Sequence, residues 1–274
     1  MSEPAPYEVY AIRYAENPGN KRSQVFLGGD SHDGPMPMDY YVWVITGNGR
    51  RFVVDVGFKQ ETGQRRKRGV LRCPSAGLAQ IGIARETVDE IIITHLHYDH
   101  AGNLDLFPHA NIHLQDREMS FATGRHMCHR TFSGGFEIDD VVQMVRSVYR
   151  GKAVFHDGDE EIAPGISLHL IGGHTLGLQV VRVWTQRGWL VLASDAAHYY
   201  ANLAKRRPFV WSLDVGETVE GYRKLLELAQ SPDHIIPGHD PAVMQQYPAP
   251  SRELEGIVAR VDVAPKFSAI ASAR

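Results

Sequence analysis

The sequence predicts an α/β fold built as a sandwich, and three observations lead to this fold class. Short apolar or alternating runs typical of strands recur along the chain, separated by segments of helical character. The two halves, residues 1–150 and 151–274, each run through strands and then a helix, which indicates a pseudo-symmetric arrangement. Histidines and aspartates directly follow several predicted strands, so they would gather on loops at one edge of a rigid scaffold.

The composition fits one globular domain covering residues 1–274, since 43% of the residues are hydrophobic and 22% are charged. The net charge of -3 does not indicate a nucleic acid or an anionic membrane as a partner. Two cysteines, Cys73 and Cys128, are too few for a disulfide framework. The first residues lack the basic and apolar regions of a secretory signal, so we expect a cytoplasmic protein.

In the N-terminal half, strands are predicted at residues 7–14, 39–46, 51–56, 88–93 and 110–114. Residues 47–50, Gly-Asn-Gly-Arg, predict a hairpin turn because Gly and Asn tolerate positive φ. Residues 17–37 are rich in Gly, Asp, Ser and Pro and are predicted to form a loop. Helices are predicted at residues 75–83 and over most of residues 116–149, with a break at residues 133–135.

In the C-terminal half, strands are predicted at residues 153–156, 166–171, 179–185, 189–193 and 234–236. An amphipathic pattern predicts a helix at residues 217–229, and residues 252–261 are predicted to form a final helix.

A basic cluster at residues 65–68, Arg-Arg-Lys-Arg, allows two interpretations. It could bind an anion or belong to a lid, or it could be a solvated loop or helix face. We favour the solvated face, because runs of like charge are most often exposed.

The strongest functional signal is Thr-His-Leu-His-Tyr-Asp-His-Ala-Gly at residues 94–102, which follows an apolar run. If the backbone stays extended after the strand, His95 and His97 point to the same side. Asp99 and His100 would then lie in the turn, and Ala101 and the next residue would open a helix or a tight loop. This set of side chains suits two adjacent divalent metals. A histidine-rich surface turn is the alternative, and the complete pattern after a buried strand argues against it.

Further motifs follow: Gly-Gly-His-Thr at residues 172–175, Ser-Asp-Ala at 194–196 and Pro-Gly-His-Asp at 237–240. Together with the first motif and with Asp55 near a strand end, they resemble the metal-site motifs of the metallo-β-lactamase superfamily over roughly residues 40–245. The resemblance implies an αβ/βα four-layer sandwich, in which two mixed β-sheets face each other and helices lie outside.

The resemblance also implies the ligands of two divalent metal ions. The separate ligands would be His95, His97 and His174 for one metal, and Asp99, His100 and His239 for the other. Asp195 would bridge both metals. Imidazole and carboxylate ligands suit Zn²⁺, and Mn²⁺, Fe²⁺ and Co²⁺ tolerate the same set.

Within the superfamily, the chain is most similar to the N-acyl-homoserine lactonase group. The similar features are the N-terminal strand, loop and hairpin, the helical insert before His174, and Gly-His-Thr-Leu-Gly followed by Gln179. The resemblance implies opening of a lactone ring by a hydroxide that bridges the metals, on an acyl-homoserine lactone or a catabolic lactone intermediate. The expected partner is a small-molecule lactone, and related lactonases imply a homodimer.

Three residues are candidate catalytic groups: Asp99, His198 and Tyr199. The resemblance implies that Asp99 moves a proton to the leaving oxygen. Lactonases of this group carry a substrate-binding tyrosine three residues after the bridging aspartate, where this chain has His198. We expect His198 to face the substrate without binding metal, with Tyr199 or Tyr200 as alternatives. The pocket is expected to lie between residues 24–38, 117–136 and 198–211.

Other activities stay open on the same ligand set. Glyoxalase-II-like thioesterases share all the ligands, although the basic glutathione-binding residues that they usually carry are not evident here. Some β-lactamase groups have a cysteine where this chain has Asp195, which counts against antibiotic hydrolysis. A non-catalytic metal-binding protein is a third interpretation, and the complete ligand set argues against it.

Overall fold

The computed structural model describes residues 4–30 and 33–273 and shows two facing β-sheets. The first sheet contains β1 (Glu8–Asn17), β2 (Met38–Gly47), β3 (Arg50–Val54), β4 (Gly69–Val70), β5 (Glu90–Ile92), β6 (Asn111–Gln115), β7 (Ala153–His156) and β13 (Val258–Arg260). The second contains β8 (Glu160–Ala163), β9 (Ile166–Leu170), β10 (Gln179–Thr185), β11 (Gly188–Ser194) and β12 (Ile235–Pro237).

The strand order confirms that both sheets are mixed. The first sheet has the order β13-β1-β2-β3-β5-β6-β7, with β4 paired to β1, and the second has the order β12-β11-β10-β9-β8. Strands β3, β5, β6 and β7 run parallel, as do β11 and β12, and the remaining pairs are antiparallel.

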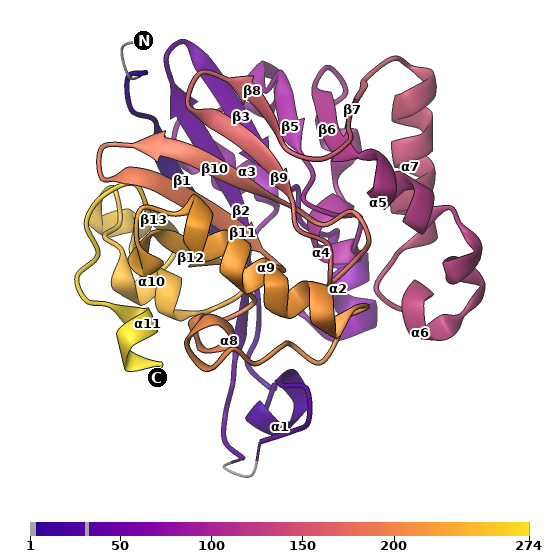
Figure 1. Ribbon diagram of the computed structural model, residues 1–274. Coiled ribbons are helices and arrows are strands. Elements are labelled where there is room, and N and C mark those ends of the chain that lie inside the picture. The colour runs from indigo at the N-terminus through magenta and orange to yellow at the C-terminus, as the bar shows by residue number, and fades with distance from the viewer. Residues whose placement is uncertain (1–3, 31–32, 274) are drawn as a thin grey trace.

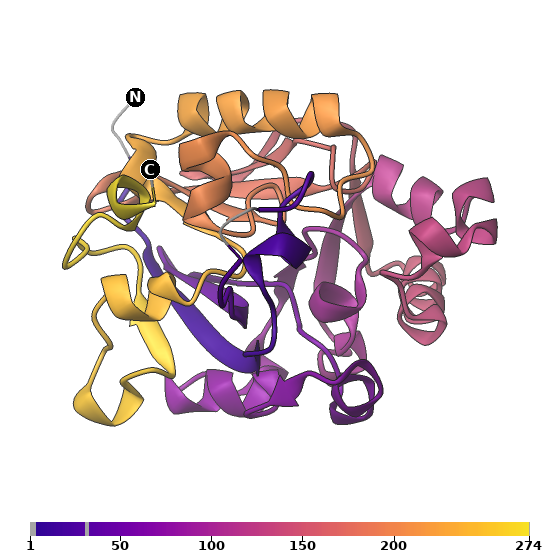
Figure 2. The same ribbon diagram turned by 90° about the horizontal axis from the view of Figure 1, so that it is seen from below.

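Helices lie outside the two sheets, which gives the expected αβ/βα layers (Figure 1). The helices are α1 (Arg22–Val25), α2 (Gln60–Arg66), α3 (Pro74–Gln80), α4 (Tyr98–Ala101), α5 (Asp116–Ala122), α6 (Arg130–Ser133), α7 (Ile138–Tyr149), α8 (Tyr200–Lys205), α9 (Val215–Leu228), α10 (Ala242–Gln246) and α11 (Ala269–Ser272). Figure 2 shows α9, in orange, beyond one sheet and α3, in violet, beyond the other. None of the helices in the described ranges combines the length and hydropathy needed to cross a membrane.

Alternation along β2 explains how one strand serves two cores. Trp43 and Ile45 belong to the core between the two sheets, whereas Val42 and Val44 belong to the core between the first sheet and its helices. All four side chains are fully buried, because successive residues of a strand point to opposite faces.

The hairpin predicted from residues 47–50 is confirmed. Strands β2 and β3 pair in antiparallel register up to Gly47 and Arg50, and the two residues between them, Asn48 and Gly49, both have positive φ. This is the turn geometry whose twist matches that of the flanking strands. The predicted loop at residues 17–37 contains the short helix α1, and residues 31–32 lie outside the described residues.

The final helix predicted at residues 252–261 is wrong. A 3₁₀ turn covers Arg252–Leu254, and Gly256 then adopts φ +71°, which ends any helical path. The segment that follows is β13, whose Val258 and Ala259 are buried and pair with β1. Burial of these side chains on the edge of the first sheet outweighs the weak helical pattern.

Candidate metal centre

The candidate ligands lie just after strand ends. His95 and His97 follow β5, Asp99 and His100 lie on α4, His174 follows β9, Asp195 follows β11 and His239 follows β12. The helix of the first motif runs from Tyr98 to Ala101, so it begins earlier than expected and carries Asp99 and His100 itself. All these residues are buried, and none has more than 9% of its surface exposed to solvent.

Strained backbone at two strand ends sets the direction of the site. Asp55 and Ser194 have φ of +60° and +44°, which is unusual for residues with a side chain. Asp55 accepts hydrogen bonds from the backbone N–H and hydroxyl of Thr94 at 2.8 and 2.9 Å, and the Nδ1–H of His100 donates to it at 2.7 Å. Asp55 therefore fixes both the start of the first motif and the ring of His100.

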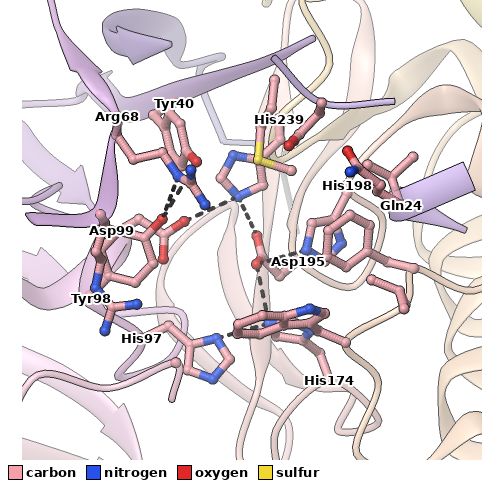
Figure 3. A pocket seen from close by; sticks show the side chains of 18 residues that line it. Gln24, Tyr40, Arg68, His97, Tyr98, Asp99, His174, Asp195, His198 and His239 are labelled. Atoms are coloured by element: carbon pink, nitrogen blue, oxygen red, sulfur yellow. Dashed lines mark hydrogen bonds and ion pairs between the residues drawn. The ribbon is translucent and has the colours of Figure 1, made fainter. Parts of the chain in front are cut away.

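Asp195 faces two groups of imidazoles with its two oxygens. Its Oδ2 lies 3.2 Å from Nε2 of His174 and 3.7 Å from Nε2 of His95. His97 completes this first group, with its Nδ1 3.0 Å from Nε2 of His174. Figure 3 shows His97 and His174 on this side of Asp195.

The other oxygen, Oδ1, faces the second group. It lies 2.9 Å from Nε2 of His239 and 3.3 Å from Nε2 of His100. Asp99 Oδ2 lies 3.7 Å from Nε2 of His100 and 3.8 Å from Nε2 of His239. One carboxylate thus touches both groups, as a bridging ligand does.

Several donor atoms of these groups are buried without a hydrogen-bond partner in the described part of the chain. They include Nε2 of His95, Nε2 of His100 and Oδ1 of Asp195, although Oδ1 lies close to the imidazoles. Such atoms are costly to bury unless something else binds them. One group offers three imidazole nitrogens and a carboxylate oxygen, and the other offers two imidazole nitrogens and a carboxylate oxygen. Such groups fit a binuclear site for divalent metals.

Hydrogen bonds at Nδ1 hold two of the imidazoles in the orientation that a metal requires. The Nδ1–H of His239 donates to the carbonyl of Asp39 at 2.9 Å, and that of His100 donates to Asp55. Both rings then present Nε2 to the centre. Burial and neighbouring imidazoles lower the pKa of His95 and His97 well below the usual value, so these two rings are neutral and able to bind a metal.

The site opens into a cavity of about 360 Å³. Residues from all three segments expected at the pocket line it or the adjoining cavity of about 310 Å³: among them are Gln24, Met38, Phe121, Phe132, His198 and Trp211. The adjoining cavity is mainly apolar and shares His97, His174, Val210 and Trp211 with the first.

A family model described as the metallo-beta-lactamase superfamily matches residues 36–239, which include every candidate ligand. The chain belongs to the metallo-beta-lactamase superfamily.

Relatives of the chain within the superfamily bear lactonase names. The chain is 31% identical over 134 residues to N-acyl homoserine lactonase AiiB of Agrobacterium fabrum, covering 46% of each chain. It is 27% identical over 165 residues to an N-acyl homoserine lactonase of Bacillus cereus, covering 60% of each. The chain therefore spans about half the length of the curated relatives that it matches.

Solved structures agree on the fold. A quorum-quenching N-acyl homoserine lactone lactonase superposes with a TM-score of 0.72 at 20% identity, covering 87% of this chain and 94% of the other. A lactone hydrolase with the product N-hexanoyl-L-homoserine at its catalytic metal centre superposes with a TM-score of 0.69 at 19% identity, with the same coverage.

His198 lies three residues after Asp195, at the position that corresponds to the substrate-binding tyrosine of the resemblance described above. It lines the cavity, its Nε2 is 3.0 Å from Oδ2 of Asp195, and its ring stacks on Phe209 at 3.6 Å. Tyr199 and Tyr200 are buried elsewhere: the Tyr199 hydroxyl donates to the carbonyl of Met36 at 3.4 Å, and neither tyrosine is among the described residues that line the cavity.

Glu118 is a supporting residue that the sequence did not reveal. This fully buried carboxylate accepts hydrogen bonds from the backbone N–H of Leu96 and of Gly177 and from the hydroxyl of Thr175. It therefore ties the loop of His95 and His97 to the loop of His174. The one hint in the sequence is that Glu118 lies in the first turn of a helix that follows a strand. Its hydrogen-bond partners are too distant in the sequence to be inferred from it.

The basic cluster at residues 65–68 is only partly the solvated face that we expected. Arg65 and Lys67 are exposed, whereas Arg66 and Arg68 line the metal-site cavity. Arg66 donates to the carbonyls of Gly134 and Phe136. Gly135 lies between them, and it packs so tightly on His97 that an added Cβ would lie 2.6 Å from Nε2 of that ring. Arg66 thus holds the backbone that packs against the ring of His97, a candidate ligand.

Proposed function

We propose that this protein is a dinuclear metal-dependent lactonase, with an acyl-homoserine lactone or a lactone intermediate of a catabolic pathway as substrate. The observation that carries the proposal is the Asp195 carboxylate, each oxygen of which faces a group of imidazoles. The site opens into the main cavity, and the adjoining, mainly apolar cavity forms an apolar extension of it. The lactonase names of the relatives support the choice of substrate class.

Three overlapping groups of side chains lie close enough to hold a metal, one of them Asp195, His198 and His239, and we assign the ligands to the other two. His95, His97 and His174 would hold one metal and Asp99, His100 and His239 the other, with Asp195 shared between them. When bound, such a pair of metals lowers the pKa of water to near neutrality and polarises an ester carbonyl. The three imidazoles of the first group are buried and positioned by the loops that Glu118 joins.

Two side chains would act on the substrate directly. Asp99 lines the cavity and can carry a proton to the alkoxide that leaves when the ring opens. His198 is fixed by its stacking on Phe209, and when Asp195 binds metal the imidazole N–H that now faces Asp195 would become available to the substrate oxygen where negative charge develops. Tyr199 is the alternative donor, and its contact with the Met36 carbonyl makes His198 the better candidate.

The apolar extension suits the hydrocarbon part of an acyl group. Phe121, Phe132 and Trp211 line it together with Val210 and Leu213, and it joins the main cavity beside His97 and His174. Transfer of each methylene from water into such a space contributes about 0.8 kcal/mol. We therefore expect kcat/KM to rise with acyl length until the extension is filled.

A substrate panel tests the proposal. The metal-loaded protein would be assayed with N-hexanoyl-L-homoserine lactone, simple γ- and δ-lactones, S-lactoylglutathione and a penicillin, with acid release followed by a pH indicator. We expect a lactone to exceed the thioester and the β-lactam in kcat/KM by at least about tenfold. Strong turnover of the thioester without turnover of any lactone would assign the chain to the thioesterases instead.

A further inference from the structure

Arg68 is a cationic side chain in the wall of the metal-site cavity. It is half-buried, and it lines the cavity together with Tyr40, Tyr98 and Asp99. Its Nε–H donates to the hydroxyl of Tyr98 at 3.3 Å, and that hydroxyl lies 3.4 Å from the hydroxyl of Tyr40 (Figure 3). Arg68 is therefore held in place by neutral phenols next to the ligands of the second metal group.

The neighbouring arginines form ion pairs, whereas Arg68 forms none with the residues that the structure describes. Arg65 and Arg66 form ion pairs with Glu137 at 2.8 and 2.7 Å, and Arg66 also stacks on the ring of Tyr98 at 4.0 Å. Among the residues that the structure describes, none places a carboxylate within ion-pair distance of Arg68, whose hydrogen-bond partner is Tyr98. The Asp99 carboxylate acts on the charge of Arg68 without forming an ion pair with it, so the guanidinium keeps donors for a further anion.

An arginine in this setting is suited to bind an anion. The guanidinium has five N–H donors in a planar fork that matches a carboxylate, and the hydrogen bond to Tyr98 uses the donor at Nε. The guanidinium keeps its charge at all pH values of interest and loses little hydration when it binds. The tyrosine contact fixes its direction, which reduces the entropy lost on binding.

Away from Arg68, the lining of the cavity becomes apolar. Trp211, Phe132 and Leu213 line the apolar extension beside His174, whereas Arg68 lies beside Asp99. Figure 3 shows Asp195 between the side that holds Arg68 and Asp99 and the side that holds His174. A substrate whose ester carbonyl sits at Asp195 can therefore extend toward a cation in one direction and toward apolar side chains in the other.

We propose that Arg68 anchors an anionic group of the substrate, so that the preferred substrate is a lactone that carries a carboxylate. The inference rests on the proposed lactonase function and narrows its substrate class. Arg68 acts as a specificity residue and takes no part in the proton transfers.

The test compares two lactones of the same size that differ in charge, 5-oxotetrahydrofuran-2-carboxylate and its carboxamide. With metal-loaded wild-type protein we expect kcat/KM for the carboxylate to exceed that for the carboxamide by about ten- to a hundredfold, the range of a charge-assisted hydrogen bond. Arg68→Gln should bring the two values together and leave the carboxamide within about twofold of wild type, whereas Arg68→Lys should keep part of the preference.

Arg65→Gln is the matched control, because it removes the same charge from an exposed side chain outside the cavity and should keep the full preference. Higher salt should reduce the preference of the wild type by screening. Equal losses on both lactones in Arg68→Gln would show that Arg68 only supports Tyr98 and would overturn the proposal, as would a wild type without preference.

A binding measurement separates this inference from the proposed function. If neither lactone is hydrolysed, the lactonase proposal fails, and calorimetric binding of the same two compounds still decides the role of Arg68. Binding of the carboxylate form that is stronger than that of the carboxamide, and that is lost in Arg68→Gln, would support the anion site on its own. Equal binding of the two forms, or of neither, would reject it.

Discussion

Asp195 couples the two halves of the candidate metal centre through the two oxygens of one carboxylate. Its position depends on Ser194, whose positive φ turns the chain at the end of β11, and on hydrogen bonding of the Ser194 hydroxyl with Thr94 at 2.9 Å. The same Thr94 binds Asp55, which in turn orients His100. Residues from three strand ends therefore position one another before any metal is bound.

His198 gives the most specific prediction at the scale of one residue. Replacement by alanine should lower kcat/KM for a lactone by about ten- to a thousandfold, because a donor to the developing charge is lost. Metal content, measured by elemental analysis, should not change. Tyr199→Phe should have little effect, since its hydroxyl contacts the Met36 carbonyl away from the cavity.

The opposite pattern would reassign these residues. Loss of a metal equivalent in His198→Ala would make His198 a ligand, as its distance of 3.0 Å from Asp195 would allow. Normal kinetics in His198→Ala together with impaired Tyr199→Phe would give the substrate contact to the tyrosine.

At the residue level, local spacing identified the candidate ligands but not their supports. His95, His97, Asp99 and His100 fall within one short motif after an apolar strand, so their proximity is evident in the sequence. Glu118 could not be identified in this way, because its partners lie 22 to 59 residues away. The direction of Arg68 depends likewise on the end of α2, where Lys67 adopts φ +56° and turns the chain inward.

Helix α7 carries a buried carboxylate that should make stability depend on pH. Asp140 is 8% exposed, and burial raises its pKa to about 6 from the ordinary value of 3.8. Glu137, Asp139 and Asp105 act in the same direction, and Lys59 acts against them. The folded state therefore keeps this proton to higher pH than the unfolded state. The cost of ionising Asp140 in the folded protein is absent below about pH 4, grows as the pH rises, and is complete above about pH 6.

Replacing Asp140 with asparagine should remove this cost. At pH 7.5 the free energy of unfolding should rise by about 1–3 kcal/mol, because one pKa unit corresponds to about 1.4 kcal/mol, and at pH 4 it should hardly change. Calorimetric unfolding at both values measures the difference. Asp139→Asn, at the exposed neighbouring position, is the control, and an equal gain at the two pH values in Asp140→Asn would contradict the account.

Among the elements, length decided what the sequence could predict. Strands β2, β10 and β11 and helix α9 have clear periodicity and were predicted to within a few residues. Strand β8 and helices α8, α10 and α11 are too short for a period to be recognised. Strand β8 is fixed by pairing with β9, and the three helices by packing on other segments. The segment at β13 was assigned to the wrong class because its pairing with β1 joins opposite ends of the chain.

For the whole molecule, the sandwich brings candidate ligands from residues 95 to 239 to one site. The first sheet supplies the motif after β5, and the second supplies the residues after β9, β11 and β12. Asp195 and His239 follow neighbouring parallel strands, so their side chains emerge side by side. The proposed binuclear centre therefore lies where the two sheets meet, and we expect its candidate ligands to be held in place even in the metal-free protein.

Metal titration with activity as the readout is the most direct test of the central claim. Protein stripped with a chelator would receive Zn²⁺ in steps, with bound metal and lactone hydrolysis measured at each step. We predict that hydrolysis is negligible without metal and reaches its maximum at about two equivalents per chain, as a site bridged by Asp195 requires. Full activity at one equivalent, or no lactone hydrolysis with two metals bound, would contradict the account.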